Sequence, residues 1–463
     1  MNNLEEIMQT ISIGLVVATF LLYTGRALKT IELCKESLFF LNQALNMEEQ
    51  ITKRIYGAIY RTMFDAYYRI SGKTNVITYG KKLLTIYREC GDRVQERNLS
   101  MPLVRIYYSQ SMYSEAKELC ERAIIVKSQV GDRAGEAVCY NNLGALLKVT
   151  AKIYFEKEMK IRMEIGDRAG EAVCYTNLGA VFGSLIEYVK TAECLEKALV
   201  IVKEIGDKAR EAECYRDLGT LFWSLREYVK TAECLEKALL IVKEIGDKAG
   251  EAECYRNLGT VFGSLREYIK ASEYLEKGLV IAKEIGDKKI EAACYRMLGS
   301  VLLPLGEYVK AEDYLEKAFL MVKEIGDKEM KAACCANLGV MFNYLGDYFK
   351  ATDYLEKALA ISMETGDSAK QTVYYRVLGA VFNSLGEYVK ATEYLEKTLE
   401  IVKEIGDKKG VAFYYGNLAI PFGRRGEYVK TAEYLEKALA ISMEIGDREK
   451  EAENCTNLGI TFH

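Results

Sequence analysis

The stretch CYRNLGTVFGSLREYIKASEYLEKGLVIAKEIGD, from Cys254 to Asp287, decides the fold because it returns along the chain with a period of 40 residues. Its closing Gly-Asp pair marks the register, and the seven successive intervals from Gly166 to Gly446 all have that length. Self-similarity at such a period is typical of a solenoid, in which each unit buries its apolar face against its neighbours.

Two helices are predicted in each unit. The first runs over about 248–264, where Tyr255, Leu258 and Phe262 share one apolar face. The second runs over about 268–285, Gly286 fits a helix C-terminus, and Asp287 fits the N-cap of the next helix. The turn between the two helices suits a left-handed residue. Four units place glycine there: Gly306, Gly346, Gly386 and Gly426.

The composition is that of a folded, all-α protein. Half of the 463 residues are hydrophobic, 28% are charged, and three prolines leave long helices uninterrupted. The formal net charge of −4 gives no general attraction to nucleic acid, so no nucleic-acid partner is expected.

The cysteines are expected to be structural. The chain has thirteen of them, none in a C-x-x-C pair, and its one histidine is His463, which leaves little for a metal site. We interpret them as small buried side chains in a reducing, cytoplasmic environment, and expect neither metal nor cofactor. Five recur at one register of the repeat: Cys174, Cys214, Cys254, Cys294 and Cys334.

An apolar run near the N-terminus is assigned to the first repeat. It covers 13 residues, Ile11 to Tyr23, short of the roughly 20 needed to span a bilayer. The following segment, 25–38, aligns with 306–319 of a regular unit. The run is therefore predicted to be a first helix, and no membrane segment is expected.

At this point the repeat resembles a known family. Tyr255, Leu258, Gly259 and Phe262, with Ala271, Leu275 and Gly278, match the large and small positions of the tetratricopeptide repeat. The 40-residue length and the NLG and EIGD segments resemble the LGN/Pins scaffold family, without its C-terminal G-protein-binding motifs. The resemblance implies a right-handed superhelix of about ten antiparallel helix pairs, with the first helices on the concave side.

Two regions are distinguished by repeat regularity. Residues 1–130 read as degenerate helical repeats and 131–463 as a regular array, with a shortened unit around 145–166 and an incomplete last unit. In the shortened unit, five turn residues are missing between Leu147 and Ala151, and a local break in the superhelix is predicted. Pro421, inside a first helix, predicts a kink or hinge.

Two columns of polar residues are predicted to face the groove. Asparagine amides there can pair with the backbone of an extended peptide, or can bridge neighbouring helices. The asparagine candidates are Asn142, Asn177, Asn257, Asn337 and Asn417.

The second column contains arginines that favour carboxylates. Glu213 and Glu253, three residues earlier on the same helices, are candidates to neutralise Arg216 and Arg256, whereas Arg296 follows Ala293. The alternative is a set of surface ion pairs. The arginine candidates are Arg216, Arg256, Arg296 and Arg376.

Trp223 is the only tryptophan and stands where sibling units have Gly183, Gly263 and Gly423. It is either an anchor for a ligand or a filler between hairpins.

The sequence favours a binding protein over an enzyme. It has no phosphate-cradling glycine loop, no G-x-S-x-G and no H-E-x-x-H, and its recurring Asp and Glu are assigned to caps and outer faces. The preferred hypothesis is a cytoplasmic signalling scaffold or adaptor that binds an extended, acidic protein or peptide segment. The alternatives are the regulatory or sensor repeats of a larger multidomain protein, and a self-associating spacer.

Overall fold

The computed structural model describes residues 2–43, 49–70, 72–147 and 150–461. Within these ranges the chain forms twenty-three α-helices and no strand, so the all-α prediction is confirmed. The chain divides into two compact units, Met1–Asp207 and Lys208–His463. Lys148 and Val149 of the shortened turn, and His463, lie outside the described residues. The predicted division at residue 131 concerns repeat regularity and stays a prediction.

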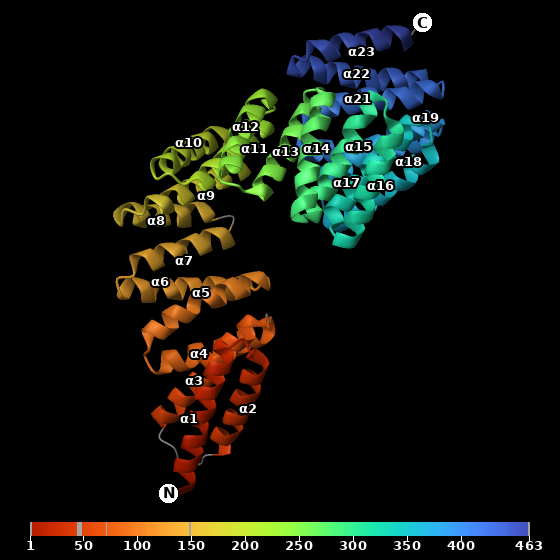
Figure 1. The fold of residues 1–463 in the computed structure, drawn as a ribbon. Coiled ribbons are helices and arrows are strands. Elements are labelled where there is room, and N and C mark those ends of the chain that lie inside the picture. The colour runs from red at the N-terminus through yellow and green to blue at the C-terminus, as the bar shows by residue number, and fades with distance from the viewer. Residues whose placement is uncertain (1, 44–48, 71, 148–149, 462–463) are drawn as a thin grey trace. The chain divides into compact units, whose positions relative to one another are not determined.

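The first unit contains ten helices in its described residues, and each packs against the next along the chain (Figure 1). They are α1 (Asn2–Tyr23), α2 (Ala27–Gln43), α3 (Glu49–Arg69), α4 (Lys73–Glu89), α5 (Arg93–Ser109), α6 (Tyr113–Gln129), α7 (Arg133–Leu146), α8 (Ala151–Glu164), α9 (Arg168–Ser184) and α10 (Tyr188–Glu204).

The second unit continues the pattern with six hairpins and one further helix in its described part (Figure 1). These are α11 (Lys208–Ser224), α12 (Tyr228–Glu244), α13 (Lys248–Ser264), α14 (Tyr268–Ile285), α15 (Lys288–Leu302), α16 (Tyr308–Ile325), α17 (Lys328–Tyr344), α18 (Tyr348–Thr365), α19 (Ser368–Leu385), α20 (Tyr388–Ile405), α21 (Lys408–Arg424), α22 (Tyr428–Ile445) and α23 (Arg448–Thr461), with a 3-10 turn at Leu303–Leu305. The described chain thus has eleven hairpins, one more than the ten expected.

The helix ends follow the predicted capping residues. α13 and α14 have the bounds expected from the sequence, and Gly286 closes α14 in the left-handed conformation, with φ of 72°. The Asp287 carboxylate then accepts hydrogen bonds from the backbone N–H groups of Lys289 and Ile290, at 3.0 Å each. These groups have no partner inside the helix, so the cap satisfies them.

The turn inside each hairpin also has a left-handed residue, as predicted. Gly306 has φ of 76°, and the same position is left-handed with a side chain at Ser111, Ile186, Arg226 and Arg266. A left-handed residue with a Cβ costs roughly 1–2 kcal/mol, so these four turns store strain that the glycine turns avoid.

A leucine-on-glycine contact holds the two helices of a hairpin together. Leu258 and Leu275 are fully buried between α13 and α14. A Cβ added to Gly259 would lie 2.4 Å from Leu275 Cγ, so glycine is required at this helix crossing. The small-residue positions of the repeat therefore set the distance between the helices.

The shortened unit keeps both of its helices, and the local break in the superhelix stays a prediction. α7 and α8 each have 14 residues, against 17 in α9 and α10, so the missing residues come from the helix ends beside the turn. The hairpin survives, and α7 still packs against α6 and α8 against α9. Helices α6 to α9 thus pack one against the next on both sides of the shortened turn.

Pro421 does not interrupt its helix. α21 runs through the proline to Arg424 and packs against α22 as in the other hairpins. The proline removes one backbone donor near the C-terminal end of the helix, and its own carbonyl still accepts a hydrogen bond from the Arg425 N–H, at 3.2 Å. The kink or hinge expected at Pro421 stays a prediction.

One column of glutamates was wrongly assigned to caps and outer faces. These residues are 5–7% exposed, and each of the last five pairs with a Lys or Arg three residues earlier. In α15, for example, Lys288 Nζ lies 2.8 Å from Glu291 Oε2. The column is Glu96, Glu136, Glu171, Glu211, Glu251 and Glu291.

The N-terminal apolar run is on the first helix of the first hairpin, as predicted. Ile11 and Ala18 are buried, and α1 packs against α2 and α3. The argument that the apolar run is too short to span a bilayer is wrong, because the helix that contains the run extends beyond it. Among the described residues, Glu6–Tyr23 is the one segment long and apolar enough to cross a membrane, and 17% of it is buried.

The cysteine column is buried as predicted. Eleven of the thirteen thiols are buried, and Cys90 and Cys455 are exposed. Burial raises the pKa of Cys254 to about 11 and the pKa values of Cys294 and Cys334 to about 12. These thiols therefore stay protonated at neutral pH.

Candidate functional site

The first helices of the second unit form what we call its inner face. α13 touches α15, α15 touches α17 and α17 touches α19, in addition to the contacts within and between successive hairpins. Because the first helices of neighbouring hairpins approach one another, they lie on the inner side of the curve. This is the face on which the asparagine and arginine columns were predicted.

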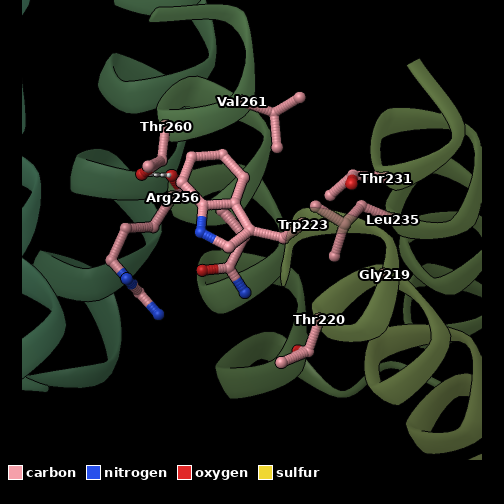
Figure 2. A pocket seen from close by; sticks show the side chains of 9 residues that line it. Gly219, Thr220, Trp223, Thr231, Leu235, Arg256, Thr260 and Val261 are labelled. Atoms are coloured by element: carbon pink, nitrogen blue, oxygen red, sulfur yellow. Dashed lines mark hydrogen bonds between the residues drawn. The ribbon is translucent and has the colours of Figure 1, made fainter. Parts of the chain in front are cut away.

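A cavity on this face surrounds Trp223 and is called the Trp223 cavity (Figure 2). It has a volume of about 260 Å³ and lies between the α11–α12 hairpin and α13. Three predicted site residues line it: Trp223, Arg256 and Asn257. Thr220 and Thr260 also line the cavity, and the sequence analysis did not identify them. Their hydroxyls lie one helical turn from the asparagine and arginine columns. The Thr260 hydroxyl donates to the Arg256 carbonyl at 3.0 Å.

Trp223 is partly open to solvent. Its side chain is 36% exposed, and its ring packs edge-on against Tyr228, with centroids 5.0 Å apart. Figure 2 shows the indole between Leu235 and Thr231 on one side and Val261 and Thr260 on the other. The ring therefore fills part of the gap between hairpins and leaves part of its surface open to solvent.

Arg216 and Arg256 share one carboxylate. Arg216 Nη1 lies 2.8 Å from Glu253 Oε2, across to the next hairpin, and Arg256 Nη2 lies 3.8 Å from Glu253 Oε1. The sequence prediction for Arg256 is met, but the partner of Arg216 is Glu253 and not Glu213. This ion pair joins α11 to α13, the first helix of the next hairpin.

Arg296 and Asn337 are different, because they carry buried donors without a partner. In the described part of the chain, neither Arg296 Nε nor Asn337 Nδ2 has a hydrogen-bond acceptor. Burial, with the nearby positive charge of Arg256, lowers the pKa of the Arg296 guanidinium below its usual value. A buried unpaired donor costs about 1–3 kcal/mol, which an incoming acceptor would recover.

Asp217 occupies the asparagine column in α11. Burial raises its pKa to about 6, Glu213 acts in the same direction, and Arg216 opposes them. An acidic group therefore stands beside the arginines at a position where most siblings have a neutral amide.

The other predicted residues have separate environments. Asn142 donates its amide to Met101 Sδ at 3.4 Å, in the preceding hairpin of the first unit, which matches the bridging alternative. Asn177, Asn417 and Arg376 are half-buried. The described residues contain no cluster of three or more potential metal ligands.

The architecture defines the class: each unit is an α-solenoid of stacked antiparallel helix pairs. A family model described as the tetratricopeptide repeat matches residues 290–364 and 370–444. These two segments are tetratricopeptide repeats, and this part of the predicted resemblance is confirmed. The finer resemblance to LGN/Pins is not shown and stays a prediction.

Solved structures share the fold at low sequence identity. The apo form of the quorum sensor NprR from B. thuringiensis is 15% identical, with a TM-score of 0.53 over 73% of this chain and 99% of that chain. Aspartyl phosphate phosphatase F from Bacillus subtilis is 14% identical, with a TM-score of 0.51 over 74% of this chain and 92% of that chain. Such likeness shows the fold alone. No curated protein matches the chain.

Proposed function

We propose that the chain is a non-enzymatic scaffold that binds an extended, acidic protein segment on the inner face of its second unit. The observation that carries this proposal is the pair of buried, unpaired donors on Arg296 and Asn337. The cytoplasm is the proposed location, because eleven buried thiols suit a reducing compartment.

A carboxylate is the group that best satisfies these donors. A guanidinium donates to a carboxylate in a charge-assisted bond about twice as strong as a neutral one, and an amide N–H adds a second donor. Arg296 has no acidic residue three positions before it, because Ala293 stands there. Binding an acidic side chain would therefore neutralise a positive charge that the described residues leave unpaired.

The Trp223 cavity supports the proposal as the place for an anchoring side chain. At about 260 Å³ it is smaller than the roughly 300–1,000 Å³ of small-molecule sites, so it fits one side chain of a longer ligand. Aromatic residues in partly enclosed pockets contribute much of the energy of protein interfaces. Asn257 at its edge offers both a donor and an acceptor for the ligand backbone.

The test is a peptide-display selection on the full chain beside two matched variants, Arg296→Met and Arg216→Met. Both remove one guanidinium from the same column, but only Arg296 is unpaired. We expect acidic extended peptides to be enriched, with affinity at least tenfold lower for Arg296→Met and within about threefold for Arg216→Met.

The same peptides should change the fluorescence of Trp223, which is the only tryptophan and so reports on one place in the chain. Equal losses in the two variants, or enrichment of basic peptides, would contradict the proposal. A folded chain that enriches nothing, and that forms larger assemblies with rising concentration in sedimentation, would instead indicate the self-associating spacer.

A second candidate function is a sensor or regulatory array of a larger signalling protein. It is favoured by a second, larger cavity in the second unit, with a volume of about 750 Å³. The likeness in fold to a protein described as a quorum sensor agrees with this candidate. A binding assay with small molecules tests it separately from the peptide selection.

A further inference from the structure

The larger cavity, here called the Arg226 cavity, lies entirely within the second unit. Its lining comes from the α11–α12 turn, from α19, from the end of α20, from α21 and from α23. The turn is thus brought against hairpins that follow it by more than 140 residues. The lining residues that matter for a ligand are Arg226, Arg376, Lys409, Lys450, Phe413 and Tyr414.

The charge of this lining is strongly positive. Four cationic side chains face one acidic residue, Asp407, whose carboxylate already caps α21 by accepting a hydrogen bond from the Gly410 N–H at 3.0 Å. Lys409 is paired with Asp447, at 3.1 Å, and Lys450 with Glu453.

The two arginines are the free cations of the cavity. Within the described residues, neither Arg226 nor Arg376 has a carboxylate within ion-pairing distance. Arg226 also has a left-handed backbone, with φ of 60°, at the turn position where the hairpins from α15–α16 onward use glycine. A strained backbone conformation costs free energy, so a charged side chain that occupies such a position and lines a cavity indicates a functional site.

The cavity also has an aromatic wall. Phe413 is 40% exposed, and Lys450 Nζ lies 5.6 Å from its ring centroid. Tyr414 is buried beside it, and the charge of Arg376 acts on its hydroxyl. A flat ligand stacked on Phe413 would lie close to the cationic groups. The volume of about 750 Å³ falls within the range of small-molecule sites.

We propose that the Arg226 cavity binds a small organic anion with a flat, apolar body, of the nucleoside phosphate type. Arg226 and Arg376 hold the anionic group through charge-assisted hydrogen bonds, and Phe413 packs against the flat body. Because Arg226 belongs to the first hairpin of the unit and the other groups to its last ones, the bound anion joins these hairpins across the curve of the solenoid. Binding therefore resists opening of the second unit.

The test uses the full chain in calorimetric titrations with three probes: ADP without metal, inorganic pyrophosphate and adenosine. ADP carries both the anion and the flat body, pyrophosphate only the anion, and adenosine only the body. We expect ADP to bind at least tenfold more tightly than either partial probe.

A matched pair of variants locates the site. Arg226→Gly and Arg266→Gly remove the same side chain from the same left-handed turn position of adjacent hairpins, but only Arg226 lines the cavity. ADP affinity should fall at least tenfold in Arg226→Gly and stay within about twofold in Arg266→Gly. Both variants relieve backbone strain, so loss of folding does not confound the comparison.

Three outcomes would overturn the proposal. The first is equal ADP affinity in the two variants, which would place binding elsewhere. The second is pyrophosphate or adenosine binding as tightly as ADP, which would remove the role of the aromatic wall or of the arginines. The third is no binding of any probe at millimolar concentration to a folded chain. None of these outcomes bears on the peptide-binding proposal, which rests on Arg296 and Asn337.

Discussion

The hairpins α11–α12 and α15–α16 stand two repeats apart and share most of their pattern, yet their groove faces differ. In the first, Arg216 is paired with Glu253; in the second, Arg296 has an unpaired, buried Nε. Asp217, with its raised pKa, corresponds to Met297. The comparison teaches that one register of the repeat can hold a paired or an unpaired arginine, because the partner of Arg216 comes from the next hairpin and not from its own helix.

The two hairpins also differ in how tightly their helices approach. A Cβ added to Gly299 would lie 2.5 Å from Leu315 Cγ, whereas one added to Gly219 would find its nearest neighbour, Leu235 Cγ, at 3.5 Å. Gly219 lines the Trp223 cavity, so the looser hairpin is the one that has room beside it for a ligand.

The largest expected effect tests this difference in packing. Gly299→Ala forces Leu315 to move and should destabilise its hairpin by about 2 to 3 kcal/mol. Gly219→Ala meets only ordinary contacts and should gain up to about 1 kcal/mol from helix propensity. Hydrogen exchange of peptides from α15–α16 and from α11–α12 measures the change in stability of each hairpin separately. Equal effects at the two sites would show that the hairpins are equally tight.

The second prediction concerns pH. Because the pKa of Asp217 is raised to about 6, the folded state prefers the protonated acid, and stability present at low pH is lost as pH rises through 6. Asp217→Asn should therefore match the wild type at pH 4 and gain about 1 to 2 kcal/mol at pH 8. Urea unfolding followed by Trp223 fluorescence measures this.

The reverse substitution, in the next hairpin, tests the same explanation of the pH dependence. Asn257→Asp, in the next hairpin, should lose stability over the same pH range, since it places a carboxyl at the equivalent position. A gain in Asp217→Asn that is the same at pH 4 and pH 8 would show that titration is not its cause.

The third prediction concerns the turns. Arg226 has φ of 60° and Gly306, its counterpart, has φ of 76° with no atom near its missing Cβ. Arg226→Gly should therefore stabilise its hairpin, and Gly306→Ala should destabilise the other, each by about 1 kcal/mol. Thermal unfolding of the two variants against wild type is the measurement, and shifts of the same sign would contradict the assignment of strain.

The smallest effect tests the shared carboxylate. Glu253→Gln breaks a partly exposed ion pair and should cost only about 0.5 kcal/mol. It also leaves Arg216 unpaired, as Arg296 is, so acidic peptides should bind a few-fold more tightly. A double-mutant cycle with Arg216→Met separates the two effects, and no coupling between the positions would show that the pair is absent in solution.

The sequence predicts well those features that depend on residues close together in the chain. The bounds of α13 and α14 follow from Asp247, Gly286 and the apolar spacing, because caps and periodicity act within a few residues. The same reasoning placed Trp223, Arg256 and Asn257 on one face, and they do line one cavity. A kink or hinge was expected at Pro421, and α21 runs through this residue to Arg424.

Contacts between hairpins could not be predicted in the same way. The partner of Arg216 depends on how α13 stacks on α11, and the three-residue spacing on one helix indicated Glu213 instead. The meeting of Arg226 with Lys409 and Phe413 depends on the curvature accumulated over several repeats. Small rotations per hairpin set that curvature, and no single stretch of sequence contains it.

The regular column of buried thiols gives the array a set of internal chemical probes. Cys254, Cys294 and Cys334 lie in successive hairpins and are unreactive while buried, since their raised pKa values keep them as thiols. An alkylating reagent added to the native chain modifies each of them only when its own hairpin opens. Mass spectrometry of the modified peptides would then record the order in which the hairpins separate, without any label introduced by mutation.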